Sequence, residues 1–357
     1  MRKLKNKLQK IPDKYINRLL TGFGILSLFT FFDIETLKKI DLWGISGIAN
    51  TVDSFDWPIL DFFAKSYIKI IVYVLLGLLL LLRIYKSTTH PKAIIISHSS
   101  FSNDQSSHDS SIVSGYSVKE KNINLVNHMA RHNIVDAIRI QDTLIEEALN
   151  DCDKSTELFY YGIAHIPLIF RAGFQVGDEG KVRLLHKYRN DQPLFKEVSS
   201  DPDNCTVMLE TSTRSNTKAS REMLVVIATS LPVTDEDLSI FRYDNICYEL
   251  RFKMKDESMY GFDSVNSYAA MNRLRKGILN KIRENVIKRN ITRIHMVLAT
   301  SSDFTFYLAQ SFSKNHDPEV VVYHYDRNTA VKYPWGISNI LSPEDAVIYH
   351  STSLSNN

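Results

Sequence analysis

Cysteine is scarce in this chain. Only three of its 357 residues are cysteines, and Cys152, Cys205 and Cys247 lie far apart in the sequence. An odd number of widely spaced cysteines excludes a disulfide framework and a Cys-x-x-Cys metal pair. The cysteine content is therefore typical of a protein from a reducing compartment.

Net charge is also small, since 43 basic residues face 40 acidic ones and leave a formal charge of +3. Most of the basic excess lies in residues 1–18, which hold seven Lys or Arg and one acid, so the rest of the chain is slightly acidic. The rest of the chain therefore lacks the net positive charge that binds a long polyanion, and we expect no direct binding of a nucleic-acid polymer. Ten prolines, thirteen glycines and a hydrophobic content of 44% exclude a collagen-like or disordered chain.

Motifs of common catalytic and cofactor sites are missing as well. The sequence contains no H-E-x-x-H, no G-x-x-x-x-G-K-[ST], no G-x-G-x-x-G and no G-x-S-x-G. These motifs supply zinc ligands, phosphate-binding loops and an exposed nucleophile. We therefore expect no metal, no cofactor and no catalytic residue.

Two apolar runs without a charge stand out, at residues 19–32 and 70–82. Extended into their flanks, they predict membrane spans at about 16–34 and 66–84 within an N-terminal region of residues 1–89. Basic residues precede the first run and follow the second, while the connection is acidic, which indicates a two-pass hairpin with both termini cytoplasmic. Two buried core helices are the alternative.

Residues 90–357 alternate between short apolar runs and amphipathic helices, which is the pattern of βαβ units. The order of strand, long helix, strand, short helix and strand occurs twice. It predicts two fused Rossmann-like units, at about 90–215 and 216–357, each an α/β fold with a parallel, doubly wound sheet. The expected strands are 93–97, 158–164, 182–188, 223–228, 246–252, 294–299 and 320–325, and the expected helices are 134–149, 167–173, 271–288 and 304–312.

Ligands of parallel sheets bind beyond the carboxyl ends of the strands. Four loops end such strands, at 97–101, 162–167, 228–232 and 299–304, and they are rich in hydroxyls and histidine. Hydroxyls and backbone N–H groups at helix starts suit phosphate oxygens, although Ser and Thr also cap helices without any ligand. The candidate ligand-binding residues are His98, Ser99, Ser100, Phe101, His165, Arg171, Thr229, Ser230, Thr300, Ser301, Ser302 and Phe304.

One segment carries a family resemblance. Residues 161–174, YGIAHIPLIFRAGF, resemble the signature of the SAVED domain, and residues 294–299 with 320–323 resemble its final strands. The sequence departs from that pattern at Thr300, where a proline is frequent, and at Ala309, where a glycine is usual. The resemblance covers about residues 90–325. It implies two fused CARF-like units that bind a cyclic oligonucleotide, here a cyclic di- or trinucleotide made by a CD-NTase-type cyclase of a bacterial CBASS anti-phage system.

Together with the predicted hairpin, the resemblance implies a membrane effector. The ligand would drive homo-oligomerisation, and the clustered hairpins would contact lipid and disrupt the bacterial inner membrane to cause abortive infection. A membrane-anchored hydrolase or cyclic-nucleotide phosphodiesterase that uses His98 or His165 is the alternative, and a scaffold without a small ligand is a third reading.

Overall fold

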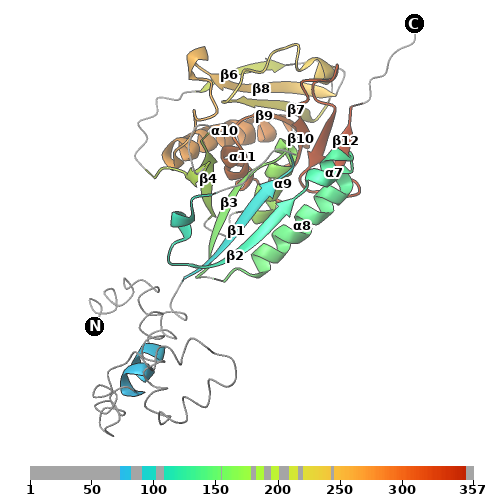
Figure 1. Cartoon of the computed structure of the whole chain (residues 1–357). Coiled ribbons are helices and arrows are strands. Elements are labelled where there is room, and N and C mark those ends of the chain that lie inside the picture. Colours follow the sequence, from blue (N-terminus) through green and yellow to red (C-terminus); the bar gives the residue numbers. More distant parts are fainter. Residues whose placement is uncertain are drawn as a thin grey trace, which may run out of the picture. The chain divides into compact units, whose positions relative to one another are not determined.

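The computed structural model divides the chain into two compact units, Met1–His90 and Pro91–Asn357 (Figure 1). The structure describes residues 73–81, 91–101, 108–153, 155–177, 182–188, 194–200, 209–215, 220–242 and 245–350. Within these ranges, none of the helices combines the length and the apolar character needed to cross a bilayer. The span predicted at 16–34 lies outside the described residues, and so does most of the one at 66–84, of which residues 73–81 form a helix.

The first sheet of the second unit has five strands in the order β2-β1-β3-β4-β5. The first four pair in parallel, and β5 runs antiparallel beside β4. Its strands are β1 (Lys92–Ser99), β2 (Ser117–Asn124), β3 (Glu157–Ile163), β4 (Val182–Lys187) and β5 (Phe195–Glu197). The helices between them are η2 (Ser110–Val113), α7 (Val126–Ala130), α8 (Ile134–Asn150) and α9 (Ile166–Val176).

The second sheet has seven strands in the order β12-β11-β10-β9-β7-β8-β6, and its four central strands, β10, β9, β7 and β8, pair in parallel. Its strands are β6 (Leu209–Ser215), β7 (Glu222–Ala228), β8 (Ile246–Met254), β9 (Arg293–Ala299), β10 (Glu319–His324), β11 (Trp335–Ser338) and β12 (Val347–Tyr349). The helices are η3 (Ser239–Arg242), η4 (Glu257–Met259), α10 (Tyr268–Arg289) and α11 (Ser302–Ala309).

The two parallel cores repeat one topology. The order β2-β1-β3-β4 in the first sheet matches β8-β7-β9-β10 in the second, with α8 and α9 in the places of α10 and α11. This match confirms the predicted α/β fold of two similar units. β6 pairs with β8 and so belongs to the second sheet, although its residues precede the predicted boundary at 215/216.

The predicted double winding is wrong, because the long helices cover only one face of each sheet. Ile94 and Ile96 of β1 share a core cluster with the helices, whereas Ile95 packs with Ile112 and Val113 of η2 on the other face. The steps from β2 to β3 and from β3 to β4 run in the same direction across the sheet. Right-handed crossovers then place α8 and α9 on one face, and only the opposite step from β1 to β2, which contains η2, reaches the other. The second sheet has η3 in the same place.

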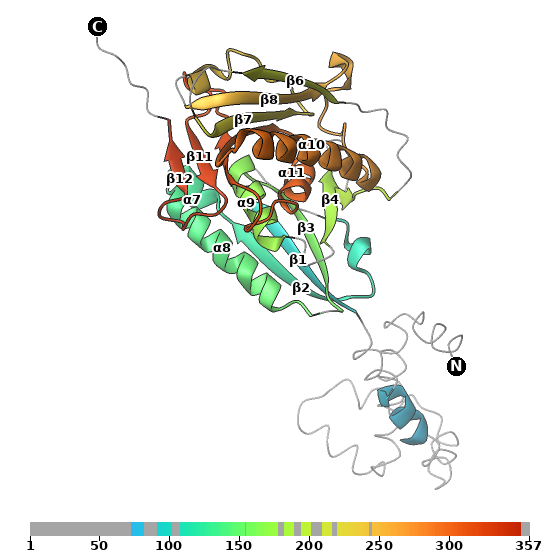
Figure 2. The same cartoon turned by 180° about the vertical axis from the view of Figure 1, so that it is seen from behind.

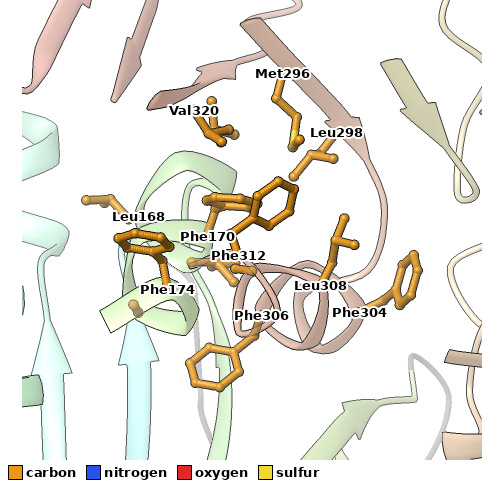
Figure 3. Close-up of a cluster of buried hydrophobic side chains, with 14 of the residues drawn as sticks. Leu168, Phe170, Phe174, Met296, Leu298, Phe304, Phe306, Leu308, Phe312 and Val320 are labelled. Carbon is orange, nitrogen blue, oxygen red and sulfur yellow. The ribbon is translucent and has the colours of Figure 1, made fainter. Parts of the chain in front are cut away.

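α9 and α11 lie side by side between the two sheets (Figures 1 and 2). Each helix also contacts the sheet of the other half, α9 through β10 and β11, and α11 through β3 and β4. Gly173 permits the close approach, since a Cβ there would collide with the carbonyl of Phe306. Figure 3 shows the apolar cluster around this helix pair.

The apolar pattern predicted the central strands but not the edges. β2, with the sequence SVKEKNIN, is mostly exposed, and residues 210–215 of β6 are exposed throughout. Edge strands with charged and polar side chains carry no hydrophobic signal, and this explains why these two strands were not predicted. The short strands β5, β11 and β12 were not predicted either.

Candidate functional site

A cavity of about 460 Å³ opens at the carboxyl ends of the parallel strands. The first half lines it with the ends of β3 and β4 and with Phe101, and the second half with the ends of β9 and β10 and with residues 230–233. The N-termini of α9 and α11 both reach it. The predicted location of the ligand site therefore coincides with a cavity that both halves build.

Exposed apolar side chains gather around this cavity. Phe101, Leu231, Phe262 and Tyr325 line it, and each exposes at least 40% of its surface. Large apolar groups that remain in water within one concave site are typical of a surface that binds a ligand or partner.

In the first half, the side chains of Ser100, His165 and Phe101 pack together at the cavity. Ser100 Oγ lies 2.5 Å from His165 Nδ1 and accepts a hydrogen bond of 2.8 Å from the His165 backbone N–H. Phe101 stacks on the His165 ring, with 4.3 Å between the ring centroids. Burial, together with His324 and His98, lowers the pKa of His165 to about 3. His165 is therefore neutral at physiological pH and presents a planar ring rather than a charge.

His324 continues this aromatic wall. Its ring lies 4.7 Å from His165 and stacks on Trp335 at 4.8 Å. Burial lowers the pKa of His324 to about 4. Tyr325 follows it and packs on Tyr333 at 5.4 Å. The wall suits a flat, neutral ring system such as a nucleobase.

The second half also contributes hydroxyl groups. Ser301 is the N-cap of α11, yet its side chain caps no backbone N–H, and Ser230 and Ser302 stand beside it on the cavity wall. Within the described part of the chain, Ser230 Oγ, Ser301 Oγ and Thr229 Oγ1 are buried without a hydrogen-bond partner. Thr300 also lines the cavity, but its Oγ1 is bonded to Thr305 Oγ1 at 2.6 Å.

A charged cluster joins the halves beneath this hydroxyl wall. His186 of β4 is 2.9 Å from Asp303 of α11 through Nδ1 and 2.9 Å from Asp263 through Nε2. Burial disfavours its charge, but the two carboxylates outweigh burial and raise the pKa of His186 to about 9. The cation is therefore present at physiological pH, and Lys187 adds a second basic side chain to the lining.

Six of the twelve predicted site residues line the cavity: Phe101, His165, Ser230, Thr300, Ser301 and Ser302. Among the other six, Ser99 ends β1, while Ser100 and Thr229 lie directly behind the lining. His98 is 1% exposed and bonded to Tyr160 at 3.0 Å, and burial lowers its pKa to about 3.

Arg171 and Phe304 are structural. Arg171 is 5% exposed, pairs with Asp142 at 2.6 Å and donates to the carbonyl of Ser338 at 2.6 Å. Phe304 is fully buried in the cluster of Figure 3. Both side chains are buried within the packing of α9 and α11, and neither is in the cavity lining.

Other lining residues were not among the predicted ones. Leu231 and Phe262 come from loops, and His324 from the end of β10. The end of β10 is a parallel-strand end like the other four and could have been predicted by the same rule. Phe262 follows no strand end and carries no sequence signal.

Hydrolysis would need a base and a nucleophile that reach the ligand. Ser100 and His165 form a short hydrogen bond, but the low pKa of His165 makes it a weak base, and Ser100 Oγ lies behind the lining. In the part of the chain that the structure describes, no group of three or more His, Cys, Asp or Glu side chains could hold a metal ion.

Comparison with known proteins identifies the family. Residues 141–338, more than half of the chain, match the model of SAVED, the "SMODS-associated and fused to various effectors sensor domain". The chain belongs to the SAVED family. This match confirms the resemblance of residues 161–174, and no curated protein matches the chain.

Several solved structures are similar to this SAVED chain. One is the Acinetobacter baumannii Cap4 SAVED/CARF-domain containing receptor with the cyclic trinucleotide 3'3'3'-cAAA, at 10% identity and a TM-score of 0.48, covering 68% of this chain and 51% of that one. Another is the Moraxella osloensis Cap4 receptor, at 9% identity and a TM-score of 0.41, covering 68% and 49%. The chain thus spans about half the length of these receptors.

Proposed function

We propose that this SAVED chain is a sensor that binds a cyclic di- or trinucleotide in the cavity between its two halves. The observation that carries the proposal is the division of the cavity into an aromatic wall and a hydroxyl wall with a helix N-terminus. Nucleotides need both, because their bases stack on rings and their phosphates accept hydrogen bonds.

The size and exposure of the cavity support a small ligand. A volume of about 460 Å³ lies within the range of small-molecule sites. Phe101 and Tyr325 are 42% and 43% exposed, so a base can cover them and remove apolar surface from water. A CD-NTase-type cyclase is the source of such a ligand in this proposal.

Residues 1–89 are the effector in this proposal. Their two apolar runs with basic flanks form a hairpin in the bacterial inner membrane, and ligand-driven homo-oligomerisation of the sensor clusters these hairpins until the membrane is disrupted. On the helix at residues 73–81, Leu78, Leu80 and Leu81 are 57%, 46% and 63% exposed, which suits contact with lipid.

Binding tests the sensor. We expect the full chain to bind at least one of 3'3'3'-cAAA, 2'3'3'-cAAA and cyclic di-AMP in calorimetry at micromolar concentration. Leu231→Glu places a carboxylate on the cavity wall and should abolish binding. Ile340→Glu is the matched control, because Ile340 is similarly exposed, at 50%, but lies outside the lining. Equal loss in both variants, or no binding by the unmodified chain, would reject the sensor.

The same titration separates sensing from hydrolysis. A sensor returns the cyclic oligonucleotide intact, whereas a phosphodiesterase yields linear product that chromatography detects. Product that disappears in Ser100→Ala would favour the enzyme. Charged residues in place of Leu78, Leu79 and Leu80 test the effector: we expect unchanged ligand binding but no depolarisation of cells that co-express a cyclase.

A further inference from the structure

The repeated topology gives cavity residues at the strand ends of one half counterparts in the other. Ser99 pairs with Ile163 in the first sheet, and Ala228 pairs with Ala299 in the second. Ser99 is therefore equivalent to Ala228, and the next residues, Ser100 and Thr229, correspond to each other. Ile163 is equivalent to Ala299 in the same way, and two residues further along the chain His165 corresponds to Ser301. Both His165 and Ser301 are N-caps, of α9 and α11, so two equivalent helix starts can be compared directly.

In the first half, the N-terminus of α9 has few free hydrogen-bond donors. Ser100 Oγ accepts the His165 N–H at 2.8 Å, and Pro167 in the first turn has no N–H to offer. Phe101 covers the His165 ring. A phosphate group would therefore find few donors at this end of the cavity.

In the second half, the N-terminus of α11 has hydrogen-bonding groups without a partner in the described part of the chain. Ser230 and Ser301 line the cavity, and their Oγ atoms are buried without a hydrogen-bond partner among the described residues. Ser230 is 5% exposed, and a buried polar group of this kind normally has a partner. The first N–H groups of α11 have no acceptor within the helix. Rotation of either serine side chain to another staggered rotamer can direct its hydroxyl towards the position in front of these N–H groups.

One carboxylate stands in the first turn of α11 and would repel a phosphate if it were free. Asp303 is instead bonded to His186 at 2.9 Å and is buried, so a cation sits against its charge. Lys187 on the neighbouring strand end adds positive charge to the lining. Asp237 also lines the cavity, and His186 pairs with both Asp303 and Asp263, so the phosphate position depends on hydrogen-bond donors and not on net positive charge.

We propose that the ligand binds asymmetrically, with one phosphate group at the N-terminus of α11 between the hydroxyls of Ser230 and Ser301, and with a base against the Phe101–His165 wall of the other half. This inference rests on the proposed function. It names the half of the cavity that recognises phosphate.

Two substitutions should lower ligand affinity without lowering the stability of the protein. Ser301→Asp supplies a good N-cap, so the melting temperature should hold or rise, while its carboxylate occupies the phosphate position and should weaken binding at least 100-fold. Ser230→Ala removes a buried hydroxyl without a partner, so stability should hold while affinity falls about tenfold. Ser267→Asp, at the N-cap of α10 outside the cavity lining, should change affinity less than twofold.

The probe is whichever of 3'3'3'-cAAA, 2'3'3'-cAAA and cyclic di-AMP the full chain binds most tightly by calorimetry. Loss of affinity in Ser301→Asp and Ser230→Ala with melting temperatures at or above that of the unmodified chain supports the inference. If the unmodified chain binds and both variants bind equally well, the phosphate position is wrong although the sensor stands. If Ser230→Ala unfolds the protein, its hydroxyl has a structural role and the inference is overturned. Failure of the unmodified chain to bind any probe rejects the proposed function itself.

Discussion

His186 should make the stability of this protein depend on pH between neutral and alkaline conditions. Its imidazole is 2% exposed and bridges β4 to Asp303 on α11, so its charge links the two halves. Replacement by glutamine keeps a polar side chain of similar length but cannot take up a proton. The comparison of His186→Gln with the unmodified chain therefore isolates the protonated imidazole.

The size of the effect follows from the pKa of His186. Folding raises this pKa from 6.5 to about 9, so the folded state holds the proton more tightly than the unfolded state. The resulting stabilisation is fully present below pH 6.5 and is lost as the pH rises through 9. A shift of this size corresponds to about 3 kcal/mol. That is an upper value, because the partner Asp263 is 51% exposed and screened by water.

Urea unfolding of the full chain at a series of pH values from 6 to 9.5 measures this effect. The stability advantage of the unmodified chain over His186→Gln should shrink by up to about 3 kcal/mol across that range. His316→Gln, at an exposed position, is the control and should show no such trend. An advantage that stays constant with pH would refute the assignment of a cation to the contact between the halves.

Three further predictions concern the same unit. Between pH 6.5 and 5.5 the free energy of unfolding should fall by about 1 kcal/mol for each of His98, His165 and His324. Burial lowers the pKa values of these histidines, so only the unfolded chain takes up protons in this range. Urea titrations measure this fall, and a stability that does not change with pH would contradict it. Arg171→Met should cost about 3 kcal/mol, because the partly buried carboxylate of Asp142 and the carbonyl of Ser338 lose their donor. Cyclic-oligonucleotide affinity should stay unchanged, so weaker binding by a folded variant would restore Arg171 to the site. Gly173→Val should cost about 1–3 kcal/mol by forcing α9 and α11 apart, and a neutral effect on the melting temperature would show that the helix pair is less tightly packed.

The sequence predicts the buried part of this fold well, because buried parallel strands such as β3 and β9 are continuous apolar runs. It also predicts the duplication, since the order of elements survives where sequence identity does not. The placement of helices on one face was missed because it depends on the strand order in space. That order is set by long-range pairing and has no local signature.

The candidate site shows the same division. Ser230 and Ser301 were predicted because strand ends converge in any parallel sheet. His186 lies inside a strand, and only the packing of α11 against β4 brings Asp303 to it. Arg171 lies in residues 161–174, the segment that resembles the SAVED signature, but it stabilises the interface of the halves. Motif membership therefore does not distinguish a ligand contact from a structural contact.

The most direct test of the account is a crystal structure of the chain with the cyclic oligonucleotide that it binds most tightly. The account predicts the ligand in the cavity at the carboxyl ends of β3, β4, β9 and β10, with a base on Phe101 and a phosphate oxygen within hydrogen-bond distance of Ser301. A ligand bound elsewhere on the chain, with this cavity empty, would contradict it.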